Sequence, residues 1–154
     1  MRYRINHILR VLMYVAAVVI MTACTRNNGD IGPLFGRWQL DAMSADGVKQ
    51  NIYNDSELLY VWAFQGNIIE IQTILPHQSW KKAMGIWNYT DDGIELDFSY
   101  KDNYGEGEYT QPEVLMIPRG LTRLTFASHN RGAMTLWWVN AEGVRYEYSL
   151  TKMY

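Results

Sequence analysis

The feature that most restricts the fold of this chain is a strict alternation of apolar and polar side chains. The stretch GIELDFSY, residues 93–100, places an apolar side chain at every second position and a polar one between. Side chains of a strand point alternately to its two faces, so this pattern predicts a half-buried β-strand. Asp91 and Asp92 stand directly before this stretch and form a turn signal together with Gly93. We expect Gly93 to supply the positive φ of a tight hairpin turn.

Further segments share this character, being rich in β-branched and aromatic residues and bounded by turn signals. They are a strand opened by Trp38 and the stretches 58–65, 67–75, 81–90, 122–128, 133–139 and 144–153. With residues 93–100 they make eight strands, and after the N-terminal region no segment keeps a helical period for more than two turns. The sequence therefore predicts an all-β domain.

Eight antiparallel strands form either a closed barrel or a Greek-key sandwich, and the connection lengths favour the barrel. Long links at 44–57 and 101–120 and a medium one at 76–81 alternate with tight turns at Gly66 and Asp91-Asp92-Gly93. In an up-and-down barrel this alternation gathers the longer loops at one end. We expect a closed base and a rim of loops.

A Gly-x-Trp, Gly36-Arg37-Trp38, stands at the start of the first strand. It resembles the signature of the lipocalin and calycin superfamily. The resemblance implies an eight-stranded up-and-down barrel whose tryptophan plugs the closed end, with a basic residue late in the last strand covering the ring. Lys152 has that position here and Arg145 does not, because Arg145 lies at the other end of the strand and on its opposite face. We expect a cation–π contact between Lys152 and Trp38.

The first 23 residues resemble a secretory signal. Three arginines and no acid precede an uncharged run of thirteen residues, VLMYVAAVVIMTA. A membrane-spanning helix needs about 20 apolar residues, so a cleaved signal peptide fits better than a transmembrane helix. We expect residues 1–23 to be removed, residues 24–33 to form a flexible tether, and residues 34–154 to form the barrel domain.

Cys24 is the single cysteine of the chain, so it has no partner for an internal disulfide. MTAC resembles a bacterial lipobox, whose cysteine is acylated and becomes the mature N-terminus. The resemblance implies a lipoprotein of the bacterial cell envelope, held on a membrane and facing the periplasm or the outer surface. The alternative is an ordinary cysteine near a conventional cleavage site.

The charge of the mature chain argues against one class of partner. Without residues 1–23, 11 Lys and Arg remain against 16 Asp and Glu, a formal charge of −5. Nucleic-acid binding needs a basic surface, which this composition does not supply.

Residues with catalytic or metal-binding chemistry are scarce. His77 and His129 fall in connections expected at opposite ends of the barrel, which argues against a shared metal site. Asp102, Glu106 and Glu108 lack calcium-loop spacing and fit a solvated acidic loop better. We therefore expect no enzyme, no metal and no cofactor.

Aromatic residues make up 14% of the chain, and they leave two functions open. Six of them are the candidate lining of a cavity for one small hydrophobic or aromatic ligand: Trp62, Trp87, Phe98, Trp138, Tyr146 and Tyr148. The same rings can instead fill a solid interior, because eight-stranded barrels occur in both forms. With a filled barrel, the protein would be an interaction or inhibitor module for another envelope protein, using loop aromatics such as Tyr104 and Tyr109.

Overall fold

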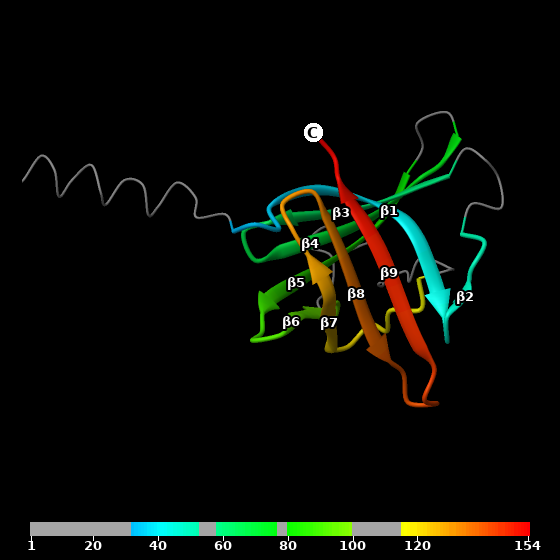
Figure 1. Ribbon diagram of the computed structural model, residues 1–154. Helices are drawn as coiled ribbons and strands as arrows, with labels where there is room; N and C mark the ends of the chain where they lie inside the picture. Colours follow the sequence, from blue (N-terminus) through cyan, green and yellow to red (C-terminus); the bar gives the residue numbers. More distant parts are fainter. Residues whose placement is uncertain (1–31, 53–57, 77–79, 100–114) are drawn as a thin grey trace, which may run out of the picture. The chain divides into compact units, whose positions relative to one another are not determined.

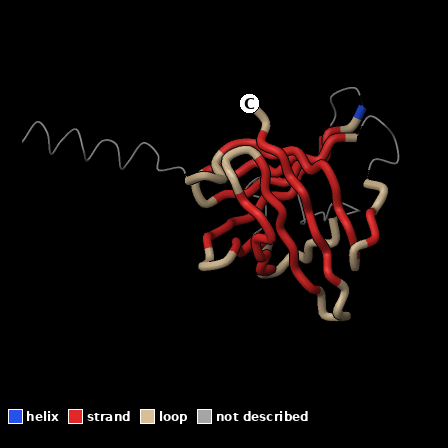
Figure 2. Tube along the Cα trace, viewed as in Figure 1, coloured by secondary structure: helices blue, strands red, loops and turns tan. Residues whose placement is uncertain are grey.

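The computed structural model describes residues 32–52, 58–76, 80–99 and 115–154, and the chain divides into two units, Met1–Pro33 and Leu34–Tyr154. The second unit is all-β and antiparallel, and Figure 2 shows strands in red making up most of it. Its strands are β1 (Gly36–Ala45), β2 (Val48–Lys49), β3 (Leu59–Gln65), β4 (Ile68–Ile74), β5 (Trp80–Tyr89), β6 (Gly93–Asp97), β7 (Thr122–His129), β8 (Ala133–Val139) and β9 (Arg145–Lys152). Among the described residues, no helix is long and apolar enough to cross a membrane.

Eight of these strands close into an up-and-down barrel (Figure 1). The order β1-β3-β4-β5-β6-β7-β8-β9 is sequential, and the pairing of β1 with β9 closes the sheet. The two-residue β2 lies inside the first long connection and pairs with the end of β1. The eight-stranded antiparallel barrel expected from the alternation is confirmed. The short β2 was not foreseen.

Because every neighbouring pair is antiparallel, the connections alternate between the two ends of the barrel. The turns after β3, β5 and β7 lie at the end that holds Gly36, which we call the base. The connections after β1, β4, β6 and β8 lie at the opposite end, which we call the rim. Asp46 and Arg145 meet there, with the Asp46 amide donating to the Arg145 carbonyl at 2.8 Å.

Two β-bulges change which side chains face inward. A bulge between Leu40 and Ala42 lets Leu40 and Met43, three residues apart, both be buried. A second bulge between Phe126 and Ser128 brings His129 against the ring of Phe126. Simple alternation of side chains fails at both places because each bulge inserts one extra residue.

The sequence-based reason given for Gly93 is wrong. Gly93 is the first residue of β6, and its φ is not among the positive values of the described glycines. A Cβ on Gly93 would lie 1.9 Å from the carbonyl oxygen of Leu124 on β7. Glycine is required here by the close approach of two backbones rather than by a left-handed turn.

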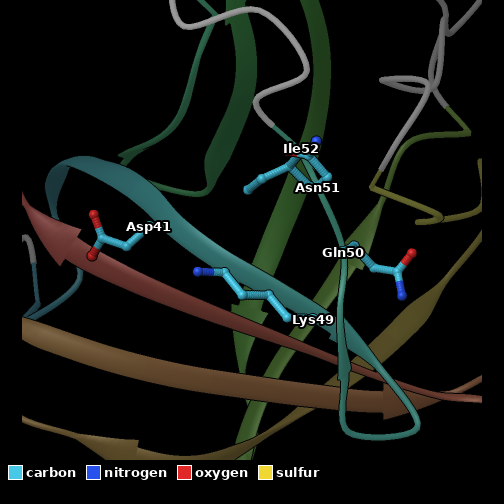
Figure 3. A pocket seen from close by; sticks show the side chains of 5 residues that line it. All are labelled: Asp41, Lys49, Gln50, Asn51 and Ile52. Atoms are coloured by element: carbon cyan, nitrogen blue, oxygen red, sulfur yellow. The ribbon is translucent and has the colours of Figure 1, made fainter.

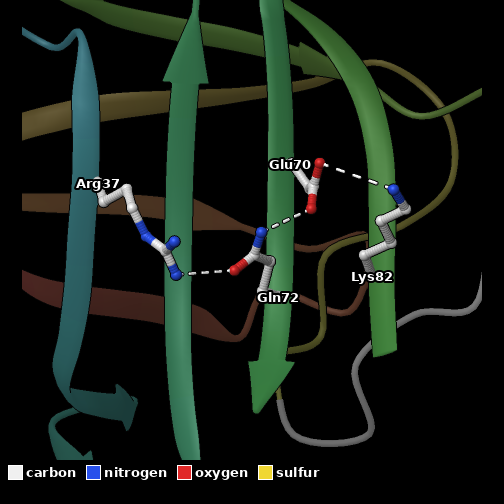
Figure 4. A network of polar contacts seen from close by, with 4 residues as sticks. All are labelled: Arg37, Glu70, Gln72 and Lys82. Atoms are coloured by element: carbon white, nitrogen blue, oxygen red, sulfur yellow. Dashed lines mark hydrogen bonds and ion pairs between the residues drawn. The ribbon is translucent and has the colours of Figure 1, made fainter. Parts of the chain in front are cut away.

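The outer wall of β3 carries a polar bridge (Figure 4). Arg37 on β1 donates to the Gln72 side chain on β4 at 2.9 Å, and Gln72 donates to Glu70 at 2.6 Å. β3 lies between β1 and β4, so this bridge passes over its outward-facing residues Val61 and Ala63, which are buried. Their small size leaves room for it.

The apolar core lies inside the barrel, and every described member of its cluster belongs to residues 34–154. The unit therefore has a hydrophobic core of its own, as an independently folding domain does.

Candidate functional site

The inner face of the barrel carries the aromatic residues that the sequence singled out. They lie on four strands and one strand end: Trp62 on β3, Trp87 on β5, Phe98 after β6, Trp138 on β8, and Tyr146 and Tyr148 on β9. All are buried except Trp138, which is partly buried and packs against the core cluster.

Four of these rings form one group. The Trp62 and Tyr148 ring centroids are 5.5 Å apart, and Trp138 stacks on Tyr146 at 5.7 Å. The Trp138 indole also donates a hydrogen bond to the Tyr148 hydroxyl at 3.0 Å. The strands β3, β8 and β9 therefore bring Trp62, Trp138, Tyr146 and Tyr148 together inside the barrel.

Trp87 and Phe98 belong to other surroundings. Trp87 packs edge-on against Phe64 at 5.1 Å and against Tyr89 at 4.9 Å, toward the base. Phe98 lies over Gly85, where an added Cβ would come within 2.7 Å of its ring. The six predicted residues thus share the interior without forming a single cluster of ring contacts.

Leu115 contacts the aromatic residues of the interior through its backbone carbonyl. The sequence analysis did not identify this residue, because nothing in its apolar side chain indicates a backbone hydrogen bond. The Tyr148 hydroxyl donates to the Leu115 carbonyl at 2.5 Å, so the indole of Trp138, Tyr148 and Leu115 form a chain of hydrogen bonds. Leu115 and Ile117, which precede β7, are fully buried in the core. Ile52, in the first long connection, is also a buried member of the core. Connections at the rim therefore send apolar side chains into the barrel.

Described residues of β1, of β2 and of the segment that follows β2 line a groove (Figure 3). Its volume is about 320 Å³, and it is lined by Asp41, Lys49, Gln50, Asn51 and Ile52. A second groove nearby is lined by Ser44, Gly47, Arg145 and Glu147. Neither is lined by any of the six aromatic residues. That those rings line a ligand cavity stays a prediction.

At the base, Trp38 is fully buried and its indole donates to the Leu34 carbonyl at 2.7 Å. Lys152 pairs with Trp38 in the β1–β9 register, and its ammonium lies 5.3 Å from the indole centroid. Gly36 has a φ of +115°, and a Cβ there would be 3.4 Å from Cε of Lys152. The three residues of the predicted base signature therefore meet.

His129 lies near this base. Its ring stacks on Phe126 with centroids 4.8 Å apart. Partial burial lowers the pKa of His129 below 6.5, and the positive charge of Lys152 lowers it further. Within the described ranges, no three His, Cys, Asp or Glu side chains come together in a way that could hold a metal ion.

Several residues named from the sequence lie outside the described part of the chain. These are Cys24, most of the tether, His77, the acidic residues 102–108, Tyr104 and Tyr109.

A sequential eight-stranded barrel, closed by its first and last strands and plugged at one end by a capped tryptophan, defines a calycin-type binding fold. A family model described as a lipocalin-like domain matches residues 19–148. The chain belongs to this family of lipocalin-like domains.

Two solved structures support the same fold. A lipocalin-like protein from Bacteroides uniformis is similar with a TM-score of 0.55 and 17% identity, over 79% of this chain and 100% of that one. An uncharacterized protein from Bacteroides eggerthii is similar with a TM-score of 0.52 and 21% identity, over 78% and 99%. At these identities the likeness concerns the fold alone. No curated protein matches the chain.

Proposed function

We propose that this protein binds one small hydrophobic or aromatic molecule inside its barrel and that an acylated Cys24 holds it on a membrane of the bacterial cell envelope. The proposal assigns it no catalytic step. The observation that carries the binding function is the group of inward-facing rings, Trp62, Trp138, Tyr146 and Tyr148, in a barrel of the lipocalin-like family.

Aromatic rings present large, rigid apolar surfaces at low cost in conformational entropy, and they suit flat or ring-bearing ligands. Trp138 is the least buried of the group, and it lies on β8 toward the rim, where the loops gather. A ligand that enters from the rim meets the Trp138–Tyr146 stack first.

The test is native mass spectrometry of the mature protein purified from its own host. A bound molecule of defined mass, released on denaturation and absent from a mock purification, is the expected result. An apolar fluorescent probe should compete with it and should quench tryptophan emission. Bare protein that binds none of a panel of apolar probes would contradict the binding function.

A second candidate is an interaction module, and exposed apolar side chains at the rim favour it. Val48 is 66% exposed and Leu121 67% exposed, with Met116 and Val139 also exposed. Their burial by another envelope protein would remove apolar surface from water. Crosslinking in host cells distinguishes the two functions. If Val48→Ser and Leu121→Ser abolish a specific crosslinked partner while ligand binding is undetectable, the interaction module is correct.

A further inference from the structure

In the part of the barrel that the structure describes, two buried tryptophans have indole N–H groups without an acceptor. Among the described residues, Nε1 of Trp62 and Nε1 of Trp87 are the buried side-chain nitrogen and oxygen atoms that lack a hydrogen-bond partner. Trp62 is fully buried and Trp87 is 5% exposed. A buried donor without an acceptor costs about 1–3 kcal/mol relative to one that is paired. Such a group therefore needs an explanation.

Two other tryptophans of the barrel have indole donors with an acceptor. Trp38 donates to the Leu34 carbonyl, and Trp138 donates to the Tyr148 hydroxyl. Trp137 lies on the outer wall, where the guanidinium of Arg145 sits 4.3 Å from its ring. The unpaired donors therefore belong to Trp62 and Trp87, both of which face inward.

The surroundings of these two donors are apolar and uncharged. Trp62 contacts the ring of Tyr148, and Trp87 contacts Phe64, the next inward-facing residue after Trp62 on β3. Among the described residues, the buried polar side-chain atoms belong to tryptophans, tyrosines and Thr122, and no charged side chain is buried. The described residues of the interior thus offer hydrogen-bond donors but no charge to neutralise an ion.

We propose that the ligand of this barrel carries a neutral hydrogen-bond acceptor, such as a ketone, ester or ether oxygen, on an apolar ring-bearing body, and that Trp62, Trp87 or both donate to it. This inference rests on the proposed binding function and names the chemical class of the ligand. A pure hydrocarbon leaves both donors unsatisfied. A carboxylate would bury a charge without a partner, which costs more than its hydrogen bonds return.

The experiment compares three ligands of nearly the same shape by titration calorimetry: 2-acetylnaphthalene, 2-ethylnaphthalene and naphthalene-2-carboxylate. The protein is the chain from residue 24 onward with Cys24→Ser, which carries no lipid and retains the whole Leu34–Tyr154 unit. We expect the ketone to bind at least about fivefold more tightly than the ethyl compound, since it satisfies a buried donor. We expect the carboxylate to bind more weakly than the ketone.

Variants show whether the preference comes from the two indoles. Trp62→Phe and Trp87→Phe remove the donor and keep an aromatic ring, so at least one of them should abolish the preference for the ketone. Trp137→Phe on the outer wall is the matched control and should preserve it. If a phenylalanine variant does not fold, β-(3-benzothienyl)alanine at that position keeps the ring shape without an N–H.

Indole N–H resonances provide a readout that needs no loss of binding. In ¹⁵N-labelled protein, the signals of Trp62 or Trp87 should move downfield with the ketone and not with the ethyl compound. The Trp38 signal should stay in place, because its acceptor is Leu34 in both states.

The outcomes separate this inference from the function on which it rests. Equal affinity for the ketone and the ethyl compound, with unmoved indole signals, overturns the inference and leaves the binding function standing. Tightest binding of the carboxylate also overturns it, because the acceptor would then be charged. If none of these compounds nor any probe of the apolar panel binds, the binding function fails and this inference fails with it.

Discussion

The ammonium of Lys152, on the last strand, lies 5.3 Å from the centroid of the Trp38 ring, on the first. The contact joins the two strands whose pairing closes the barrel, and they are aligned so that Trp38 and Lys152 are direct neighbours. The same pairing of β1 with β9 therefore closes the sheet and places the Lys152 ammonium over the buried indole at the base.

Trp38→Ala should lower the free energy of unfolding by about 3–5 kcal/mol, because it removes a fully buried ring and leaves a cavity. Lys152→Met, which keeps an apolar stem and removes the charge, should cost about 1 kcal/mol through the lost cation–π contact. Urea unfolding measures both. In the Trp38→Leu background, which has no aromatic ring, the effect of Lys152→Met should shrink, and an undiminished effect would show that the contact contributes nothing.

Gly93→Ala should destabilise the barrel by at least about 3 kcal/mol, the upper range for overpacking, because its Cβ would collide with the backbone of Leu124. Gly120→Ala is the control, since nothing lies within 4 Å of the added atom and its φ is not positive. Thermal unfolding of the two variants checks the difference. Equal midpoints would contradict the close approach of β6 and β7.

Tyr148→Phe should cost about 1–3 kcal/mol, because it leaves the partly buried indole N–H of Trp138 without an acceptor and the Leu115 carbonyl without this donor. Hydrogen exchange should accelerate in residues 115–121 more than in β3 and β4. Tyr146→Phe removes a hydroxyl from the neighbouring inward position of β9 and serves as the control. Similar exchange in both variants would show that the bond does not hold this segment.

The lowered pKa of His129 makes stability depend on pH in a defined direction. Between the ordinary value of 6.5 and the lower folded value, the unfolded chain binds more protons than the folded one, so stability rises with pH across this window. Stability is therefore lost as pH falls through 6.5. His129→Gln should flatten the difference in unfolding free energy between pH 8 and pH 5 relative to wild type. An unchanged pH dependence would show that His129 is not perturbed.

Cys24→Ser should release the protein from host membranes or leave it unprocessed, because no thiol remains to be acylated. Fractionation of host cells, with mass analysis of the N-terminus, checks this outcome. Thr22→Ser, a small-for-small change just before the cysteine, should leave the membrane fraction unchanged. A Cys24→Ser protein that is cleaved normally and still fractionates with membranes would contradict lipid anchoring.

The fold class could be predicted from the alternating pattern of the sequence, because alternation has a direct physical meaning. A strand with one wet face and one apolar face must lie against a core, and eight such strands joined by alternating short and long links close most simply as an up-and-down barrel. The resemblance carried by Gly36 and Trp38, together with the position of Lys152 late in the last strand, also predicted the contact at the base.

Features that depend on contacts between distant segments could not be predicted from the sequence and are seen in the folded barrel. The bulges at Asp41 and Ala127 shift the inward phase of β1 and β7, and no local pattern marks them, because the partner strand sets the register. The role of Gly93 depends on the backbone of Leu124, thirty-one residues away. The fold also determines whether an indole N–H has a hydrogen-bond acceptor. Trp138 donates to the Tyr148 hydroxyl, whereas Trp62 and Trp87 have no acceptor among the described residues. Sequence patterns indicate whether a side chain favours a buried or a solvated position, whereas the strand pairing of the closed sheet determines which residues it contacts.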